Sequence, residues 1–465
     1  MDNTTQKLVN FAERLRFEDL SPTTIEAAKA RILGSLGVSL AACDMEPVRI
    51  ARAVAPSVSA GPQATLFGSL DKTTPDMAAF VNSAMVRALD MNDAYVMAAV
   101  SHPSDVFPAV LAVAEAAGAS GRDLLLATVL AYEAQCRFVD VVPTSHRGWD
   151  QTPVVALGAA LGCGRLLGLT REQLAHAISL AVVPNIALNQ TRTGSLSMWK
   201  GMGGPQGARA GVFAAYLAQA GMTGADGVFE GKYGVWNQLF KGEVFDLPIP
   251  DLPINAKSAL LGHTFAVQQS AIKSFPIRMG CHAPVFAALE LRKAVDVREI
   301  VSLKIESIRQ SFERWMDVPE VWKPQTRETA DHSLPCTVAM GLLDGTITPA
   351  MMEVGRYMDA DVLALIGRCT IELPEEFAVA FPKVRNCRLT ATLKNGKTHV
   401  IEYRRTMQDD AADTGWEPSA QLLRDLTTGL LDAAAQEKLI AATATLDQAQ
   451  RVDALVALTA FKRPH

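Results

Sequence analysis

Four polar segments interrupt a chain that is otherwise rich in alanine and leucine, and they carry the side chains suited to catalysis. The first spans residues 88–105 and places Asp90 and His102 on either side of a break between helices. A carboxylate beside an imidazole defines the tautomer of the ring and keeps its pKa near working pH, which suits general acid–base catalysis. We therefore predict that His102 is a catalytic acid or base and that Asp90 orients it, although acidic residues at a helix break also serve as ordinary caps.

The second segment, residues 146–153, contains Asp150 shortly before an apolar helix. Asp150 could cap that helix, or it could line a cleft at the positively charged helix terminus. We predict the second role, with Asp150 as a catalytic carboxylate whose proton role is opposite to that of His102.

The third segment, residues 185–205, supplies Arg192 and Lys200 beside a glycine-rich stretch that leads into a helix. The stretch lacks the residue order of a phosphate-binding loop and follows no strand pattern, so it does not indicate nucleotide binding. A lysine in such a loop is either simply exposed or a point charge for a substrate carboxylate. We predict that Lys200 and Arg192 bind substrate carboxylates.

The fourth segment, residues 272–282, contains Lys273, Arg278 and His282 where the helical pattern gives way to strands. Seams between domains are preferred ligand sites, and three cationic groups so close together suit a polycarboxylate. The alternative is a linker with incidental charge. We predict that Lys273 binds the substrate, with Arg278 as a further candidate.

The elements that position these segments follow two patterns. Apolar residues recur with helical spacing over most of the first 240 positions and again over residues 418–460, with helices expected at 25–40, 74–89, 105–117, 122–137, 153–167, 171–182, 205–220 and 223–230. Residues 300–306, 369–373, 387–393 and 399–403 alternate with the period of a half-buried strand, and an Asn-Gly turn joins the last two. The patterns predict a mainly α protein with an inserted α+β domain: a helical domain over 1–269, an α+β domain over 270–404 and a helical return over 405–465.

Composition excludes several classes of function. The net charge is −5 and no basic cluster occurs, which argues against nucleic-acid binding. No stretch reaches the ~18 consecutive apolar residues of a membrane helix, and the first 20 residues lack the apolar core of a signal peptide, so we expect a cytoplasmic protein. The 7 cysteines form no C-x-x-C pair, which disfavours a zinc site or an iron–sulfur cluster. No G-x-S-x-G motif indicates a serine hydrolase.

Taken together, the segments resemble the MmgE/PrpD family over nearly the whole chain. The resemblance rests on the order and spacing of five stretches: Leu89-Asp90-Met91-Asn92-Asp93 with His102-Pro103-Ser104, Gly148-Trp149-Asp150, Lys200 in its glycine-rich loop, Ile272-Lys273-Ser274-Phe275-Pro276, and Asp331-His332-Ser333-Leu334-Pro335. It implies a large all-helical domain from both chain ends, a smaller α+β lid, and a homodimer that works without a metal or an organic cofactor.

The resemblance also implies roles for individual residues. Asp90 and His102 match the aspartate of the acidic motif and the histidine of the His-Pro motif. Lys200 and Lys273 match two lysines that line the site. His282 follows the second lysine and is expected to reach the same cleft as a substrate-binding residue.

Three positions depart from the family's decarboxylases. Ala94 replaces a threonine, with two extra residues before His102; Asp150 replaces a histidine; and Cys336 replaces a tyrosine. We therefore predict a cofactor-independent lyase for a small di- or tricarboxylate, most simply a dehydratase of a 2-methylcitrate-like hydroxy acid. The alternatives are an epimerase or isomerase at a carbon next to a carboxylate (iminodisuccinate-like), a cis-aconitate-type decarboxylase, and a non-catalytic carboxylate-binding protein.

Overall fold

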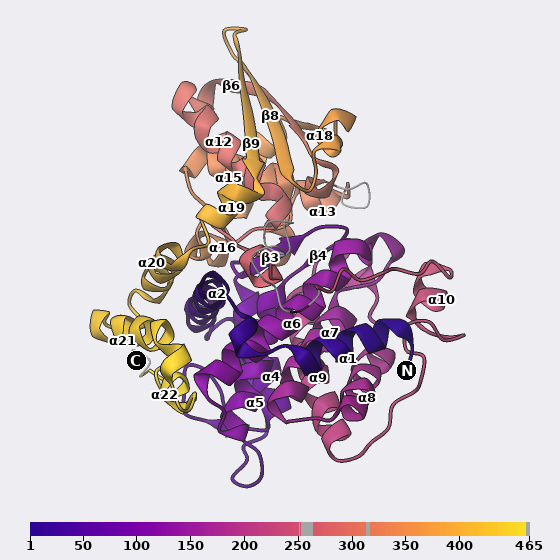
Figure 1. Ribbon diagram of the computed structural model, residues 1–465. Coiled ribbons are helices and arrows are strands. Elements are labelled where there is room, and N and C mark those ends of the chain that lie inside the picture. Colours follow the sequence, from indigo (N-terminus) through magenta and orange to yellow (C-terminus); the bar gives the residue numbers. More distant parts are fainter. Residues whose placement is uncertain (251, 253–263, 313–316, 462–465) are drawn as a thin grey trace.

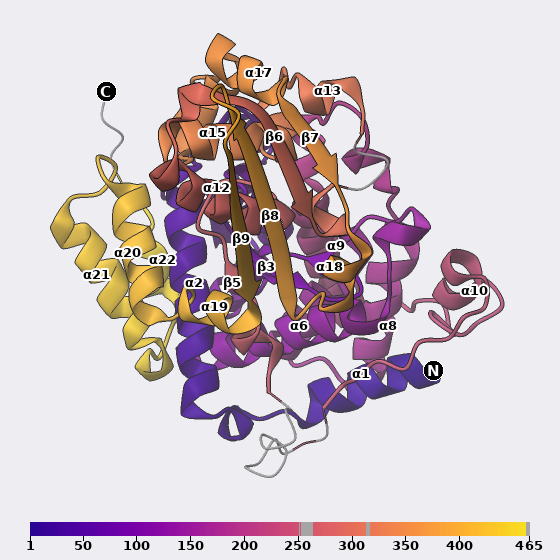
Figure 2. The ribbon, with the colours of Figure 1, turned by 90° about the horizontal axis from the view of Figure 1, so that it is seen from above.

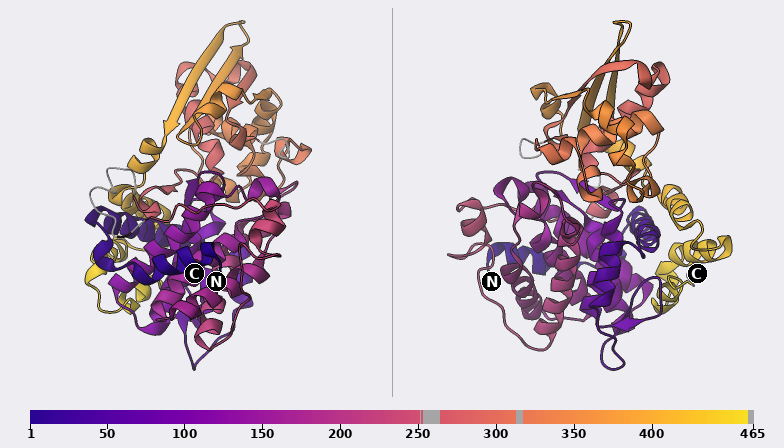
Figure 3. Two further views of the ribbon diagram at one scale, coloured as in Figure 1. Left: turned by 45° about the vertical axis from the view of Figure 1, so that its right-hand side comes forward. Right: turned by 180° about the vertical axis from the view of Figure 1, so that it is seen from behind.

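The computed structural model describes residues 1–250, 252, 264–312 and 317–461, and these form two lobes (Figure 1). The larger lobe is a helical body to which both ends of the chain contribute. The smaller lobe, here called the lid (residues 274–406), carries the long strands, and two further views show the same division (Figure 3). The predicted fold class, mainly α with an inserted α+β domain, is confirmed.

The helical body has a tightly packed centre in which α9 lies along α7. A Cβ atom on Gly211 of α9 would stand 2.5 Å from that of Ala159 on α7, so only glycine allows this approach. Because the two helices start at the same end, the loops that precede them meet there. The helices of the body are α1 (Asn3–Arg14), α2 (Pro22–Ala41), α3 (Glu46–Ala53), α4 (Pro75–Ala88), α5 (Phe107–Ala117), α6 (Gly121–Val141), α7 (Thr152–Leu166), α8 (Arg171–Val182), α9 (Gly203–Gln219) and α10 (Val235–Phe240).

The C-terminal segment returns to this body, as the helical pattern over residues 418–460 predicts. Its helices are α19 (Met407–Ala412), α20 (Trp416–Thr427), α21 (Ala433–Ala444) and α22 (Asp453–Ala457). Helix α20 packs on α2, where Gly37 leaves room for the backbone of Leu423. The N-terminal and C-terminal parts of the chain therefore share one hydrophobic core.

The helix expected over residues 223–230 is wrong, because this segment consists of turns and extended chain. Gly221 and Gly227 adopt φ angles of 95° and 66°, in the left-handed region that ends helices. Gly224 lies directly against Ser179 of α8, so the segment follows the surface of α8 rather than coiling.

The lid is built on a four-stranded sheet of β6 (Ile300–Ser307), β7 (Cys369–Glu372), β8 (Val384–Leu393) and β9 (Thr398–Thr406). The strand order is β7-β6-β8-β9, with β6 parallel to β7 and the other pairs antiparallel. Two helices, α12 (His282–Ala294) and α15 (Leu334–Asp344), pack together, and α12 contacts β8 and β9 (Figure 2). The shorter lid helices are α13 (Pro319–Trp322), α14 (Arg327–Ala330), α16 (Pro349–Glu353), α17 (Ala360–Ile366) and α18 (Glu375–Val379).

A small second sheet joins two of the polar segments at the boundary between the lobes. Its strands are β3 (Asp93–Val96), β4 (Val100–Ser101) and β5 (Ala271–Ile272), in the order β4-β3-β5. Asp93 pairs with Ile272 in antiparallel register. This pairing places the segment of Asp90 and His102 next to Lys273, although about 180 residues separate them in the chain.

Two further strands form a separate hairpin, β1 (Ala64–Thr65) and β2 (Lys72–Thr73). None of the helices in the described part of the chain combines the length and apolar character needed to cross a bilayer.

Candidate active site

A cavity lies between the helical body and the lid, and polar side chains from all four predicted segments surround it. Both lobes contribute to its lining, with Asp90, His102, Asp150, Arg192 and Lys273 from the body and Arg278, Gln310, His332 and Arg385 from the lid. Lys200 does not line the cavity itself; it is 4% exposed and contacts Asp90 and Asp331 from the protein side. The structure thus brings these residues together at one place between the lobes.

Asp90 lies at the centre of a buried cluster of charges. Its carboxylate receives Lys273 Nζ at 2.6 Å, Arg87 Nη1 at 3.1 Å and Lys200 Nζ at 3.4 Å. Burial alone would raise the pKa of Asp90, but Lys200, Lys273 and Arg87 hold it well below the usual range, so the group is an anion. Asp90 has a positive φ of 53°, an uncommon conformation that aspartate tolerates better than most residues and that sets the turn between α4 and β3.

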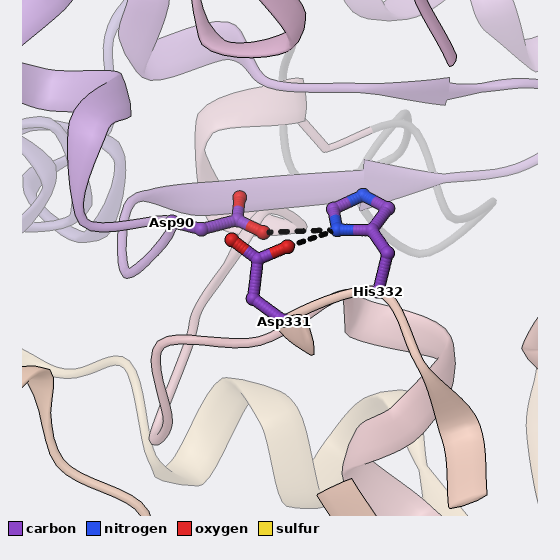
Figure 4. A group of neighbouring side chains, drawn as sticks. All are labelled: Asp90, Asp331 and His332. Atoms are coloured by element: carbon purple, nitrogen blue, oxygen red, sulfur yellow. Dashed lines mark hydrogen bonds and ion pairs between the residues drawn. The ribbon is translucent and has the colours of Figure 1, made fainter. Parts of the chain in front are cut away.

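Lys200 also connects the two lobes. Its Nζ lies 3.0 Å from both carboxylate oxygens of Asp331, which follows α14 in the lid. Asp331 in turn accepts a hydrogen bond from Nδ1 of His332, and Asp90 Oδ2 lies 3.9 Å from the same nitrogen (Figure 4). The lid therefore adds an aspartate and a histidine to the charged cluster of the body.

The tautomer of His102 is fixed by the main chain. Nδ1 lies 2.7 Å from the carbonyl oxygen of Asp93, and a carbonyl can only accept, so Nδ1 carries the hydrogen and Nε2 is the basic atom. Burial, followed by the charges of Arg87 and Lys273, lowers the pKa of His102 well below its ordinary value. The predicted orientation of His102 by Asp90 is therefore wrong: the carbonyl of Asp93 does this, while Asp90 holds the lysines. The neutral ring is suited to act as a base.

Asp150 and Arg192 both line the cavity, but they pair with each other. Arg192 Nε donates to Asp150 Oδ1 at 2.9 Å, and the same carboxylate accepts from Thr191 Oγ1 at 3.1 Å and from the main-chain N–H of Gln151 at 2.7 Å. A carboxylate that accepts from so many donors is held in one orientation. This arrangement suits a role in positioning Arg192 better than the predicted proton transfer by Asp150.

His282 lies outside the lining of the cavity, so the structure does not support a direct contact with the substrate. It opens α12, is 2% exposed, and its ring lies 5.7 Å from that of Phe275 between centroids. Arg278, four positions earlier, does line the cavity. The predicted segment therefore reaches the site through Lys273 and Arg278.

Sequence analysis missed several members of the charged cluster. Arg87 sits inside α4, where an arginine gives no signal of a site. Asp105 is fully buried beside Gln151 Nε2 at 3.3 Å, and burial raises its pKa to about 7. Asp331 and His332 belong to one of the stretches that carry the family resemblance, and this was the only signal that could have pointed to them.

Comparisons with known proteins identify two family domains over most of the chain. Residues 6–248 match the MmgE/PrpD N-terminal domain and residues 275–448 match the MmgE/PrpD C-terminal domain. The chain belongs to the MmgE/PrpD family. Among similar proteins, cis-aconitate decarboxylase of Homo sapiens is 29% identical over 412 residues, which cover 85% of this chain and 81% of the relative. The 2-methylcitrate dehydratase of Cupriavidus necator is 28% identical over 382 residues, which cover 78% and 77% of the two chains.

Ala94 and Cys336 are two of the three positions at which this MmgE/PrpD chain differs from the family's decarboxylases, and neither lines the cavity. Cys336 is in the core of the lid on α15, with Sγ 4.0 Å from Sδ of Met340, and burial raises the pKa of its thiol. Ala94 lies in a small apolar cluster with Ala271 and Met279. Neither side chain presents a reactive group to the site.

The MmgE/PrpD site also contains a set of potential metal ligands, in which atoms of Asp90, Asp331 and His332 lie within 4.8 Å of one another. The Nζ atom of Lys200 already bridges the two carboxylates, and Lys273 occupies the other oxygen of Asp90. A divalent cation at this position would face two ammonium groups at close range. The two lysines therefore neutralise these carboxylates, and the residues do not fit a metal ion.

Proposed function

We propose that this MmgE/PrpD protein is a lyase that dehydrates a hydroxy di- or tricarboxylate, 2-methylcitrate-like in structure, without a metal or an organic cofactor. The observation that carries the proposal is the imidazole of His102, which burial keeps neutral, whose Nδ1 is bound to the main chain, and which lines a cavity with several cationic side chains. The dehydratase among the similar proteins supports the same reaction class. A homodimer and a cytoplasmic location stay predictions.

The chemistry follows from the arrangement of charges. His102 removes a proton from the carbon next to a substrate carboxylate, and negative charge then builds on that carboxylate. Cations held in place before the reaction stabilise this charge without reorganising. Lys273 is the best placed of them, because it lines the cavity and its Nζ is fixed by Asp90. Loss of hydroxide from the neighbouring carbon completes the dehydration.

The lining of the cavity also includes apolar side chains that suit the methyl group of such a substrate. Strand β3 and the turn after it contribute Val96 and Met97, and the lid contributes Met279, Ile308 and Phe381. A substrate with an alkyl group beside its carboxylates would bury that group against these side chains, which contributes ~0.8 kcal/mol per buried CH₂.

A second candidate function is epimerisation next to a carboxylate. It needs two proton-transfer groups on one substrate. The cavity is lined by His102 from the body, by His332 from the lid and by the exposed His146. It differs from dehydration in that no group leaves the substrate.

The decisive experiment is incubation of the purified protein in D₂O with a panel of di- and tricarboxylates, including 2-methylcitrate, cis-aconitate and iminodisuccinate, followed by proton NMR. Dehydration is expected to give an alkene. Epimerisation would incorporate deuterium without an alkene, decarboxylation of cis-aconitate would release carbon dioxide, and binding without conversion would indicate a carboxylate-binding protein.

The pH dependence of kcat/KM should show a loss of activity on the basic side. Burial lowers the pKa of Lys273 to about 8 although Asp90 favours its charged form. Lys273 acts as a cation, so its contribution is present below this pKa and is lost as the pH rises through it. We expect kcat/KM to fall roughly tenfold per pH unit above this value. Activity that rises through pH 8 would contradict the role of Lys273.

Metal removal should leave the enzyme active. Because Lys200 and Lys273 occupy the cationic positions around Asp90 and Asp331, we expect dialysis against EDTA to leave kcat unchanged, and added Mg²⁺ or Mn²⁺ to have no effect. The measurement is the initial rate before and after dialysis, with the metal content checked by elemental analysis. A loss of rate that a divalent cation restores would contradict this assignment.

A further inference from the structure

His332 is the imidazole that the lid contributes to the cavity, and its surroundings differ from those of His102 and from those of the exposed His146. Nδ1 of His102 faces a neutral carbonyl, whereas Nδ1 of His332 faces the carboxylate of Asp331, with that of Asp90 3.9 Å away. Figure 4 shows both carboxylates on the Nδ1 side of the His332 ring, with the other ring nitrogen turned away from them. Two carboxylates stabilise an imidazolium far better than a carbonyl does. The two rings are therefore prepared for different proton roles.

Asp331 is held firmly as an anion that can support this role. Burial would raise its pKa, but Lys200 and His332 keep it below the usual value. Both oxygens of Asp331 lie 3.0 Å from Lys200 Nζ, and the main-chain oxygen of Asp331 accepts from the N–H of Arg278. Because the aspartate is fixed from two sides, it fixes the orientation of the His332 ring in turn.

The segment that carries His332 is fastened to the helical body, which fixes the position of the ring at the cavity. Thr329 Oγ1 accepts from the N–H of Leu196 at 3.1 Å, and Arg327 Nη1 donates to the carbonyl of Ala88 at 2.6 Å. Both contacts join residues just before His332 to the body. A substrate in the cavity therefore meets His102 of the body and His332 of the lid in one lining.

The charge of His332 depends on what the cavity contains. Burial and then Lys200 lower its pKa to about 4, against the opposing effect of Asp331 and Asp90. Arg192 is a further cation near the ring, since both line a neighbouring small pocket. The carboxylates of a bound substrate would offset Lys200 and Arg192 and favour the protonated ring.

We propose that His332 is the general acid of the dehydration, taking up a proton when a polycarboxylate enters the cavity and donating it from Nε2 to the leaving hydroxyl. The inference rests on the proposed function. His102 takes the proton from carbon, the C–H electron pair becomes the new C=C bond, and the C–O bond breaks. The hydroxyl leaves as water with the proton of His332. Exchange with solvent then removes the proton from His102 and returns one to His332.

A pair of substrates with different leaving groups tests this role. The probes are 2-methylcitrate and its analogue with fluorine in place of the hydroxyl, because fluoride leaves without a proton. We expect His332→Gln to lower kcat on 2-methylcitrate by about 100- to 10,000-fold and on the fluoro analogue by about tenfold or less. His102→Gln should lower both rates alike. Equal losses on both substrates in His332→Gln, or no loss on either, would overturn the proposal.

A binding measurement provides a second readout that needs no turnover. Tricarballylate is a tricarboxylate that cannot lose water, and calorimetry in buffers of different ionisation enthalpy counts the protons taken up when it binds. At pH 6 Lys273 and Asp105, whose pKa values are about 8 and 7, are already largely protonated. At this pH we expect uptake by the wild-type protein and by His102→Gln, and its loss in His332→Gln and His332→Asn. Undiminished uptake in both His332 variants would overturn the proposal.

The controls separate this inference from the proposed function. His399 is a half-buried histidine on the lid hairpin away from the cavity, so His399→Gln should behave as wild type in both experiments. Circular dichroism and thermal melting show whether the His332 variants are folded. A wild-type protein that neither binds tricarballylate nor converts either substrate would contradict the proposed function itself, and this inference with it.

Discussion

Replacing His102 by glutamine is expected to lower kcat by about 100- to 10,000-fold, the usual contribution of a general base. Nε2 of His102 is the basic atom because Nδ1 donates to the carbonyl of Asp93 at 2.7 Å, and glutamine can keep a hydrogen bond there without offering a base. The measurement is the rate of alkene formation under single-turnover conditions, which isolates the chemical step from product release.

The structure also predicts how His102→Gln should differ from a variant that merely disturbs the fold. The melting temperature and the affinity for tricarballylate should stay close to the wild-type values, because the cations of the cavity are unchanged. Deuterium incorporation next to the carboxylate should disappear together with alkene formation. Wild-type turnover by His102→Gln would show that another group is the base and would remove the main support for the proposed function.

The large elements of the fold could be predicted because local patterns specify them. Helix α8 begins where Thr170 and Gln173 form a capping box, and the Asn395-Gly396 turn between β8 and β9 has the left-handed glycine that such hairpins require. The short strands β3 and β5 could not be predicted, since two to four residues carry no periodicity. Their pairing depends on contacts between segments that are remote in the sequence.

The sequence predicted which residues belong to the candidate site, but not which of them form hydrogen bonds and ion pairs with one another. Asp90, Lys200 and Lys273 are indeed together, yet the partner of His102 is a main-chain carbonyl, which no pattern of side chains can reveal. The pairing of Asp150 with Arg192 depends on how α7 and the following loops pack, because 42 positions separate them. Side chains in a buried network satisfy one another first, so charge and spacing alone cannot say which groups stay available to a substrate.

The buried cluster at the centre of the site contains three cations, Arg87, Lys200 and Lys273, and three carboxyl groups, Asp90, Asp331 and Asp105. Burial raises the pKa of Asp105 to about 7, so near neutral pH this group carries only part of a negative charge and the cluster keeps an excess of positive charge. Burying charges in this way costs free energy unless each is paired. An excess of positive charge next to a cavity is therefore better explained by an anionic ligand than by stability. This imbalance distinguishes an active-site cluster from an ordinary buried ion pair.

A double substitution tests this interpretation, because it separates catalysis from charge balance. Lys273→Met should lower kcat by about 100- to 1,000-fold, as the loss of one fixed donor to a developing negative charge does. It should also destabilise the fold, but by less than the roughly 3–5 kcal/mol of an orphaned buried charge, because Lys200 and Arg87 still face Asp90.

Adding Asp90→Asn to Lys273→Met removes one charge of each sign and leaves Lys200 paired with Asp331 and Arg87 paired with Asp105. The double variant should therefore regain most of the lost stability while its kcat stays low. The two quantities come from denaturant unfolding and from single-turnover rates of the same preparations. If activity returned together with stability, Lys273 would matter only as the partner of Asp90. Another cation would then have to stabilise the transition state, and Arg278 of the lid would be the next candidate because it lines the same cavity. If instead stability returns alone, the excess positive charge of the cluster serves the reaction rather than the fold.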